Sequence, residues 1–389
     1  MAKSLFKSVT VLLILSLFNI NKTEAQEVNP NELGGQVNII STAVPFLGIT
    51  PDSRSGGMGN AGVATSPDVN AQHWNPAKFA FVPGDMGVAM SYTPWLRKLV
   101  NDINMYYLTG FKRLDEMQVI SASLRYFTLG EIIFRETADD TGMPVKPNEF
   151  AIDLGYSRVL SDHFSGAVVF RYIRSDLNSG ISQEGDMQPG NSFAADLAFY
   201  YKTTTDLFGQ NTQISSGLNI SNIGSKISYD GDTKQFIPTN MRLGVALSTD
   251  LDAYNSITFA LDANKLLVPT PGLTTETQDE YAREYEDMSV TKGIFRSFSD
   301  APGGFKEELQ EISYSVGLEY WYDKQFAARV GYFHEHENKG NRKHFTAGLG
   351  LKFNMLAIDA SYIIPVVQNN PLANTIRFTL GIDLDGIIK

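Results

Sequence analysis

The chain has 389 residues, no cysteine and a net charge of −11, from 43 acidic and 32 basic residues. The absence of cysteine excludes a disulfide framework, a thiolate nucleophile and a thiolate metal site. The acidic balance argues against a nucleic-acid partner, because binding to phosphates requires an excess of Lys and Arg.

The first residues predict a secretory signal. Two lysines precede an apolar run over residues 9–20, and residues 23–25 present small side chains at the two positions that a signal peptidase reads. The apolar run is too short to span a bilayer, and no other stretch reaches the roughly 18 apolar residues of a transmembrane helix. We therefore expect residues 1–25 to be a signal peptide. Its loss removes three lysines and one glutamate, which changes the net charge from −11 to −13.

Residues 26–84 are rich in Gly, Pro and Asn and show no sustained period, which predicts an irregular N-terminal segment. Residues 57–62 spell G-x-G-x-x-G, the phosphate-cradling pattern of dinucleotide-binding folds. We reject nucleotide binding, because no strand leads into the motif and Pro67 and Pro76 interrupt the residues that follow. The glycines are instead expected to let a compact segment pack closely against the walls of a barrel.

From residue 85 onward, apolar and polar residues alternate in repeated segments, as in half-buried β-strands. In residues 344–353, for example, every second residue from Phe345 to Phe353 is apolar. Fourteen such segments lie near residues 85–93, 104–113, 118–128, 149–158, 164–174, 192–202, 212–221, 240–249, 256–264, 311–321, 326–333, 344–353, 355–364 and 374–384. The even number predicts an all-β fold, a 14-stranded antiparallel transmembrane β-barrel over residues 85–389.

The connections between these segments alternate in length, and the longest covers residues 265–310. Outer-membrane barrels have short periplasmic turns and longer outer loops, so the order predicts that both termini face the periplasm. The polar face should line the lumen with Asp153, Arg171, Asp196, Arg242, Asp262, Arg329, Asp359, Arg377 and Asp383. A soluble β-sandwich would also alternate, but this polar face and the loop order favour the barrel.

Residues 54–64, followed by His73-Trp74-Asn75-Pro76-Ala77, resemble the plug signature of the FadL superfamily, in which an Asn-Pro-Ala element ends the plug before the first strand. Within it, the chain is most similar to the PorV (LptO) family of the Bacteroidetes type IX secretion system, on residues 74–79 and 264–271. The similarity runs from about residue 35 to the last strand. It implies a plug over residues 26–84 whose motif comprises Gly57, Gly59, Gly62, Trp74, Asn75, Pro76 and Ala77.

The resemblance implies a non-enzymatic protein embedded in outer-membrane lipid and lipopolysaccharide. Such a protein binds the translocon SprA (Sov), receives secreted proteins through their C-terminal signal domains, and passes them to an attachment complex with PorU, PorQ and PorZ. No cofactor is expected. The long loop is the expected partner contact, through Pro269, Pro271, Ile294, Phe295 and Phe298, because long ordered loops usually carry function. Alternatively, Phe295 and Phe298 fold back over the barrel mouth as a lid.

Other functions remain open at this point. FadL-type barrels that take up hydrophobic small molecules need an apolar lumen, whereas the lumen predicted here is charged. Deacylation of lipopolysaccharide would need a hydrolase site, but the chain has no G-x-S-x-G motif and no His that spacing ties to a Ser and an acid. The sequence His334-Glu335-His336, with His344 nearby, could offer imidazoles to a metal, but nothing completes a coordination sphere and we expect no metal.

Overall fold

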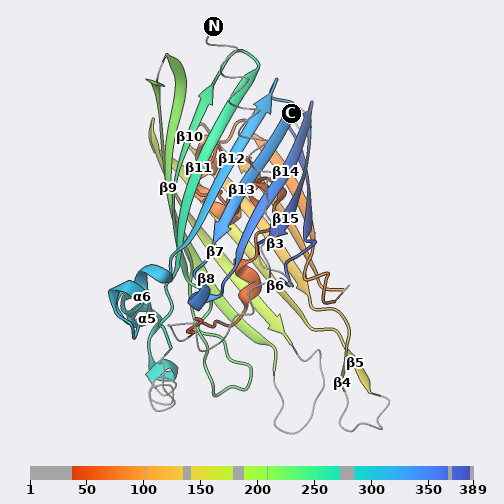
Figure 1. Ribbon diagram of the computed structural model, residues 1–389, viewed down its shortest axis with the longest axis vertical. Helices are drawn as coiled ribbons and strands as arrows, with labels where there is room; N and C mark the ends of the chain where they lie inside the picture. Colours follow the sequence, from red (N-terminus) through yellow and green to blue (C-terminus); the bar gives the residue numbers. More distant parts are fainter. Residues whose placement is uncertain are drawn as a thin grey trace. The chain divides into compact units, whose positions relative to one another are not determined.

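Fourteen antiparallel strands close into a barrel in which the first strand pairs with the last (Figure 1). The computed structural model describes residues 37–100, 102–134, 142–177, 188–207, 209–271, 284–366 and 370–385. The predicted signal peptide therefore lies outside the described residues. Closure leaves the sheet without an edge, so the backbone groups of every barrel strand can pair with a neighbour, as a lipid environment requires.

Each barrel strand overlaps one of the fourteen predicted segments, so the predicted fold is confirmed. The strands are β1 Met86–Pro94, β2 Asn104–Arg113, β3 Gln118–Thr128, β6 Asn148–Ser161, β7 Phe164–Asp176, β8 Gly190–Leu207, β9 Gln210–Gly224, β10 Asn240–Asp250, β11 Asn255–Leu266, β12 Ser313–Tyr322, β13 Phe326–His334, β14 Lys343–Phe353, β15 Leu356–Pro365 and β16 Ile376–Asp383. Outside the barrel, β4 Ile132–Phe134 and β5 Met143–Val145 form a small hairpin within a connection that the sequence predicted as loop.

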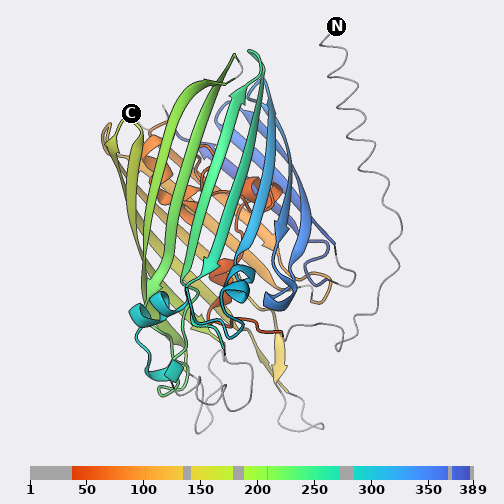
Figure 2. The same cartoon turned by 60° about the vertical axis from the view of Figure 1, so that its left-hand side comes forward.

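The two faces of the strands have the expected orientation. Phe345, Leu349, Phe378 and Leu380 are exposed on the outer surface, where they face lipid. The side chains of Asp153, Arg171, Asp196, Arg242, Asp262, Arg329 and Arg377 are buried inside. The short turns lie at the barrel end where β1 begins and β16 ends, and the long connections lie at the other end (Figures 1 and 2).

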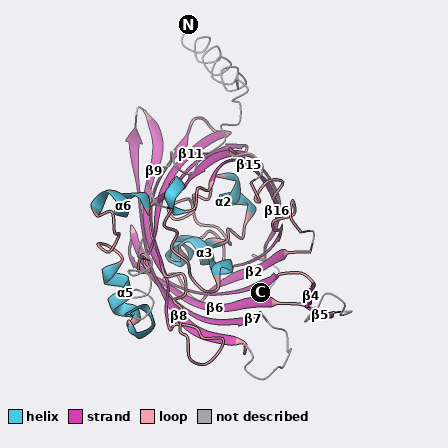
Figure 3. Ribbon diagram, turned by 60° about the horizontal axis from the view of Figure 1, so that its bottom comes forward, coloured by secondary structure: helices cyan, strands magenta, loops and turns pink. Residues whose placement is uncertain are grey.

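Residues 43–82, called here the lumenal segment, lie inside the ring of strands (Figure 3). The segment contains four short helices, η1 Pro45–Gly48, α2 Ser53–Gly57, α3 Ala71–Trp74 and η2 Pro76–Phe81. Helix α2 contacts β13 to β16, whereas η2 contacts β3 and β6 to β8, so the segment bridges opposite walls. Its length is mostly buried, which accounts for its lack of any amphipathic period.

The described part of the connection between β11 and β12 is helical at residues 284–287 and then forms α5 Val290–Arg296 and α6 Phe305–Gln310. Both stand outside the ring of strands, at the end opposite the short turns (Figures 1 and 3). The next connection at this end, between β13 and β14, contains η3 Glu337–Lys339. Among the residues that the structure describes, no helix is long and apolar enough to cross a membrane.

Candidate functional site

The glycines of the G-x-G-x-x-G motif bring the lumenal segment into direct contact with its surroundings. Gly59 has a φ of 66°, and a Cβ there would lie 2.5 Å from a backbone nitrogen of β13. A Cβ on Gly62 would lie 2.4 Å from the indole ring of Trp74. A Cβ on Gly57 would lie 3.1 Å from the backbone of β14. Larger residues at Gly59 or Gly62 would therefore displace the segment.

The amides at the end of this motif bind a carboxylate. The N–H groups of Gly62 and Val63 donate to Oδ2 of Asp262 on β11, at 2.7 and 2.9 Å. Phosphate-binding loops also use consecutive backbone N–H groups to hold an anion, which gives the sequence similarity a physical basis. Here the anion belongs to the barrel wall, so the motif fixes the lumenal segment in place.

Trp74, Asn75, Pro76 and Ala77 attach the segment to its surroundings through several hydrogen bonds. The indole Nε1 of Trp74 donates to Asp52 at 2.6 Å. The side chain of Asn75 donates to a backbone carbonyl of β8 at 2.9 Å and accepts from the Ala77 amide at 3.1 Å, which caps η2. The carbonyls of Pro76 and Ala77 accept hydrogen bonds from serine hydroxyls of β6 and β7, at 2.8 and 2.7 Å.

A buried charge network joins the lumenal segment to β12, β13 and β15. Arg54 donates to both oxygens of Glu319, at 2.9 and 2.7 Å, and pairs with Asp68 at 2.8 Å. Glu319 also accepts from Arg329 at 2.7 Å, and Arg329 pairs with Asp359 at 2.6 Å. Buried pairs of this kind depend on one another, because each removal leaves an uncompensated charge.

A second network lies on the wall formed by β6 to β9. Arg171 pairs with Asp153 at 2.6 Å and with Asp196 at 3.0 Å, and Asp153 also accepts from the Ser123 hydroxyl at 2.8 Å. The amide of Asn222, beside a bulge in the pairing of β8 with β9, donates to Asp196. The charged lumen thus contains paired side chains packed around the lumenal segment, in contrast to an apolar channel.

The connection between β11 and β12 rests on an apolar cluster at the barrel end. Residues 284–312 are called here the elbow. Gly293, on the buried side of α5, packs against the ring of Phe236. A Cβ added at Gly293 would lie 2.8 Å from this ring. Val268 and Met288 complete this buried cluster. Because a side chain at position 293 would clash with Phe236, the orientation of α5 is fixed by close packing.

Buried ion pairs hold α6 from two sides. Lys265 at the end of β11 is 3.0 Å from Glu308, and Lys339 of η3 is 3.0 Å from Glu311. Lys339 also pairs with Glu307. These side chains are almost wholly excluded from solvent, so the pairs impose a defined geometry that a solvated surface pair would not. The elbow is therefore a rigid element of the barrel end.

Four large apolar side chains of this rigid elbow are exposed. The exposed fractions are 72% for Phe295, 46% for Phe298, 77% for Phe305 and 47% for Leu309. These are called the elbow residues. Phe295 and Phe298 are both exposed, and α5, which carries Phe295, lies outside the ring of strands (Figure 3), which argues against the alternative in which the two rings cover the barrel mouth as a lid.

The other predicted contact residues lie deeper. Pro269 is buried near Gly293, whereas Pro271 and Ile294 are half-buried, so Pro269 offers no surface to a partner. Our sequence interpretation missed Phe305 and Leu309. Phe305 and Leu309 are four residues apart and are separated by the charged residues Lys306, Glu307 and Glu308. On a helix this spacing places the two apolar side chains on one face, which is the signal that could have identified them.

The possible metal ligands do not converge. Among the described residues, no group of three His, Asp or Glu side chains is arranged to hold a metal ion. His344 is buried and stacks on Phe333 at a ring distance of 5.1 Å. The side chain of His336 instead caps η3 by accepting from the Asn338 amide.

A closed barrel with an apolar outer surface and a charged, filled interior defines a transmembrane β-barrel of the outer membrane. The chain belongs to the PorV family, because the family model described as type IX secretion system protein PorV matches residues 32–273. No curated protein matches the sequence.

Solved structures with a similar fold include two toluene transporters. The Pseudomonas putida toluene transporter TodX shares 10% identity at a TM-score of 0.49, over 89% of this chain and 98% of that one. The Ralstonia pickettii toluene transporter TbuX shares 10% identity at a TM-score of 0.43, over 85% and 97%. A Pseudomonas aeruginosa FadL homologue shares 9% identity at a TM-score of 0.42, over 89% and 99%. These likenesses concern the fold alone.

Proposed function

We propose that this protein is a non-enzymatic component of the type IX secretion system that binds the translocon SprA (Sov) through the elbow residues. In this account it receives cargo through the C-terminal signal domain and delivers it to the attachment complex of PorU, PorQ and PorZ. The observation that carries the proposal is the exposure of Phe295 and Phe305 on a rigid base. Exposed aromatic residues held in a fixed geometry lose little entropy on binding and make effective interface anchors.

The proposal includes an orientation. The end that carries the elbow faces the cell exterior, and the end at which β16 finishes faces the periplasm, because outer-membrane barrels have their long loops outside. The first described residues lie at the elbow end, where the side chain of Asn38 donates to Glu307 and to the Pro271 carbonyl, so the expectation that the N-terminus also faces the periplasm finds no support in these contacts. The elbow would then be available to a partner in the plane of the outer membrane or above it. Cargo that emerges on the outer surface would meet the same end of the barrel.

The second candidate is uptake of a hydrophobic small molecule. The FadL-like barrel supports it, but the paired charges around Arg54 and Arg171 oppose it, since an apolar solute gains nothing from a charged lumen. Under this alternative, changes to the elbow would leave protein secretion unaffected, whereas changes to the lumenal segment would alter solute entry.

The test replaces Phe295 and Phe298 by Ser in cells that secrete type IX cargo. The matched control is Tyr254→Ser, because Tyr254 is an exposed aromatic residue in a short turn at the opposite barrel end. We expect the double variant to retain normal barrel levels but to lose cargo release and copurified translocon, while the control secretes normally. Unchanged secretion and copurification in the double variant would refute the proposal.

A further inference from the structure

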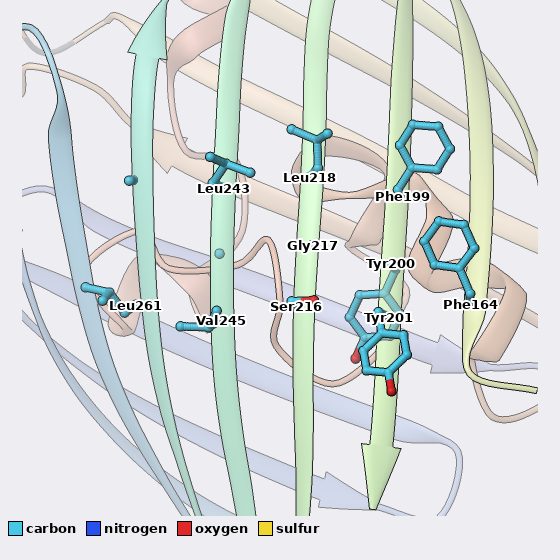
Figure 4. A pocket seen from close by; sticks show the side chains of 12 residues that line it. Phe164, Phe199, Tyr200, Tyr201, Ser216, Gly217, Leu218, Leu243, Val245 and Leu261 are labelled. Atoms are coloured by element: carbon cyan, nitrogen blue, oxygen red, sulfur yellow. The ribbon is translucent and has the colours of Figure 1, made fainter.

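The outer wall has a hollow across β8 to β11, on the face that meets lipid (Figure 4). Hydrogen-bonded register aligns Tyr201, Ser216, Val245 and Leu261 in one row across these four strands. Ser216 is the small residue of this row, and its neighbours on both sides are large. The row therefore dips at Ser216, near its middle.

A second row runs beside the first. The same four strands align Phe199, Leu218, Leu243 and Ala263 in this row. Because Ala263 is small, the row projects least from the wall at its β11 end. At the other end, Phe164 stacks on Phe199 at a ring distance of 5.8 Å and closes the hollow. Figure 4 shows Phe199, Leu218 and Leu243 projecting on the outer side of the strands. The space between the rows is about 440 Å³.

The wall behind the hollow is rigid. Gly217 and Gly244 lie on the lumenal face of β9 and β10, directly against Val63 of the lumenal segment. A Cβ on Gly217 would lie 2.5 Å from the Val63 carbonyl oxygen. Since the lumenal segment supports the strands from inside, the hollow is preformed and cannot close by an inward shift of the wall.

We propose that this hollow binds one acyl chain of an outer-membrane lipid. It is continuous with the surface that the barrel presents to the hydrocarbon, and its lining includes no charged side chain. Polar side-chain groups there are limited to hydroxyls such as those of Ser216 and Tyr201. A space without partner atoms forfeits dispersion contacts, whereas a flexible methylene chain held between two parallel rows regains them. This inference is independent of the function proposed for the elbow.

The test uses the full chain in nanodiscs of phosphatidylethanolamine that carries a photoactivatable diazirine on one acyl chain. After irradiation, the labelled positions are mapped by peptide mass spectrometry. We expect labelling at Leu218, Leu243 and Val245 to exceed labelling at Leu349 and Leu380, which face lipid on the opposite wall. Equal labelling of the two walls would overturn the proposal, because it would indicate ordinary contact with bulk lipid.

Two substitutions of the central residue sharpen the test. Ser216→Phe fills the hollow and is expected to reduce labelling there to the level of the opposite wall, whereas Ser216→Ala keeps the hollow and its labelling. Ala360→Phe, on the outward face of β15, is the control for an added ring. Heat-modifiable gel mobility confirms folding of each variant. Undiminished labelling in a folded Ser216→Phe protein would contradict the proposal. So would a photoreactive residue at position 216 that crosslinks in cells to another protein and not to lipid.

Discussion

Arg54 of the lumenal segment and Glu319 of β12 share two hydrogen bonds inside the barrel, although 265 residues separate them in the chain. The carboxylate of Glu319 also accepts from Arg329. One acidic residue therefore compensates two buried guanidinium groups and connects the lumenal segment to the wall.

Replacing Glu319 by Ala should loosen the lumenal segment. Loss of this carboxylate leaves Arg54 and Arg329 without their shared partner, at a cost of about 3 to 5 kcal/mol for breaking a buried pair. The measurements are thermal unfolding in mild detergent and protease accessibility of residues 43–82. The control is Asp85→Ala, which removes a solvent-exposed carboxylate 3.9 Å from Arg113 and should change neither measurement. Wild-type stability of Glu319→Ala would show that the network does not hold the segment.

Asp262→Ala should expose the motif amides to exchange. The substitution leaves the N–H groups of Gly62 and Val63 buried without an acceptor, at about 1 to 3 kcal/mol for each group. Hydrogen exchange at these two amides should accelerate, while exchange in the outer strands stays unchanged. Asp262→Asn keeps an acceptor oxygen and should lose less protection than the alanine variant. Equal protection in all three proteins would contradict the role assigned to this carboxylate.

Leu349→Arg should destabilise the barrel in the bilayer. Leu349 is 69% exposed in the middle of β14, on the outer face, and Arg at the bilayer midplane costs about 2 to 4 kcal/mol. Leu349→Phe retains an apolar side chain and serves as the control. Unfolding by urea in lipid vesicles measures the difference. A barrel that accepts Arg at this position without loss of stability would be inconsistent with the assigned strand register.

The packing of the elbow should weaken as the pH rises from about 4 to 6. Burial, reinforced by the nearby carboxylates of Glu308 and Glu311, raises the pKa of Asp300 to about 6, and its ordinary value is 3.8. Between these values the folded elbow binds more protons than the unfolded chain, so stability falls with increasing pH across this window and levels off above it. Hydrogen exchange in α5 measures this dependence. Asp300→Asn should abolish it, and an undiminished dependence in that variant would assign it to another group.

The barrel could be predicted from sequence because its signal is local. Every second residue from Phe345 to Phe353 faces lipid, so a single strand reveals its own register. The lumenal contacts could not be predicted in this way. The Gly62 amide meets Asp262 across 200 residues, and no pattern near either residue indicates the other.

The elbow was predicted only in part. The sequence predicted that Phe295 and Phe298 are exposed, and they are, but α5 and α6, which are too short to be stable by themselves, were not predicted. They depend on tertiary contacts such as Lys265 with Glu308, which sequence periodicity does not contain. For the same reason, the burial of Pro269 could not be anticipated.

The central claim is that the elbow contacts the secretion machinery, and site-specific photocrosslinking in living cells tests it most directly. A photoreactive amino acid replaces Phe295 in one strain and Tyr254, at the opposite barrel end, in another. After irradiation, the barrel is purified under denaturing conditions and its covalent partners are identified by mass spectrometry. We predict an adduct between position 295 and the type IX translocon that is missing at position 254. Efficient incorporation at position 295 with no adduct to the translocon or to any cargo protein would contradict the account.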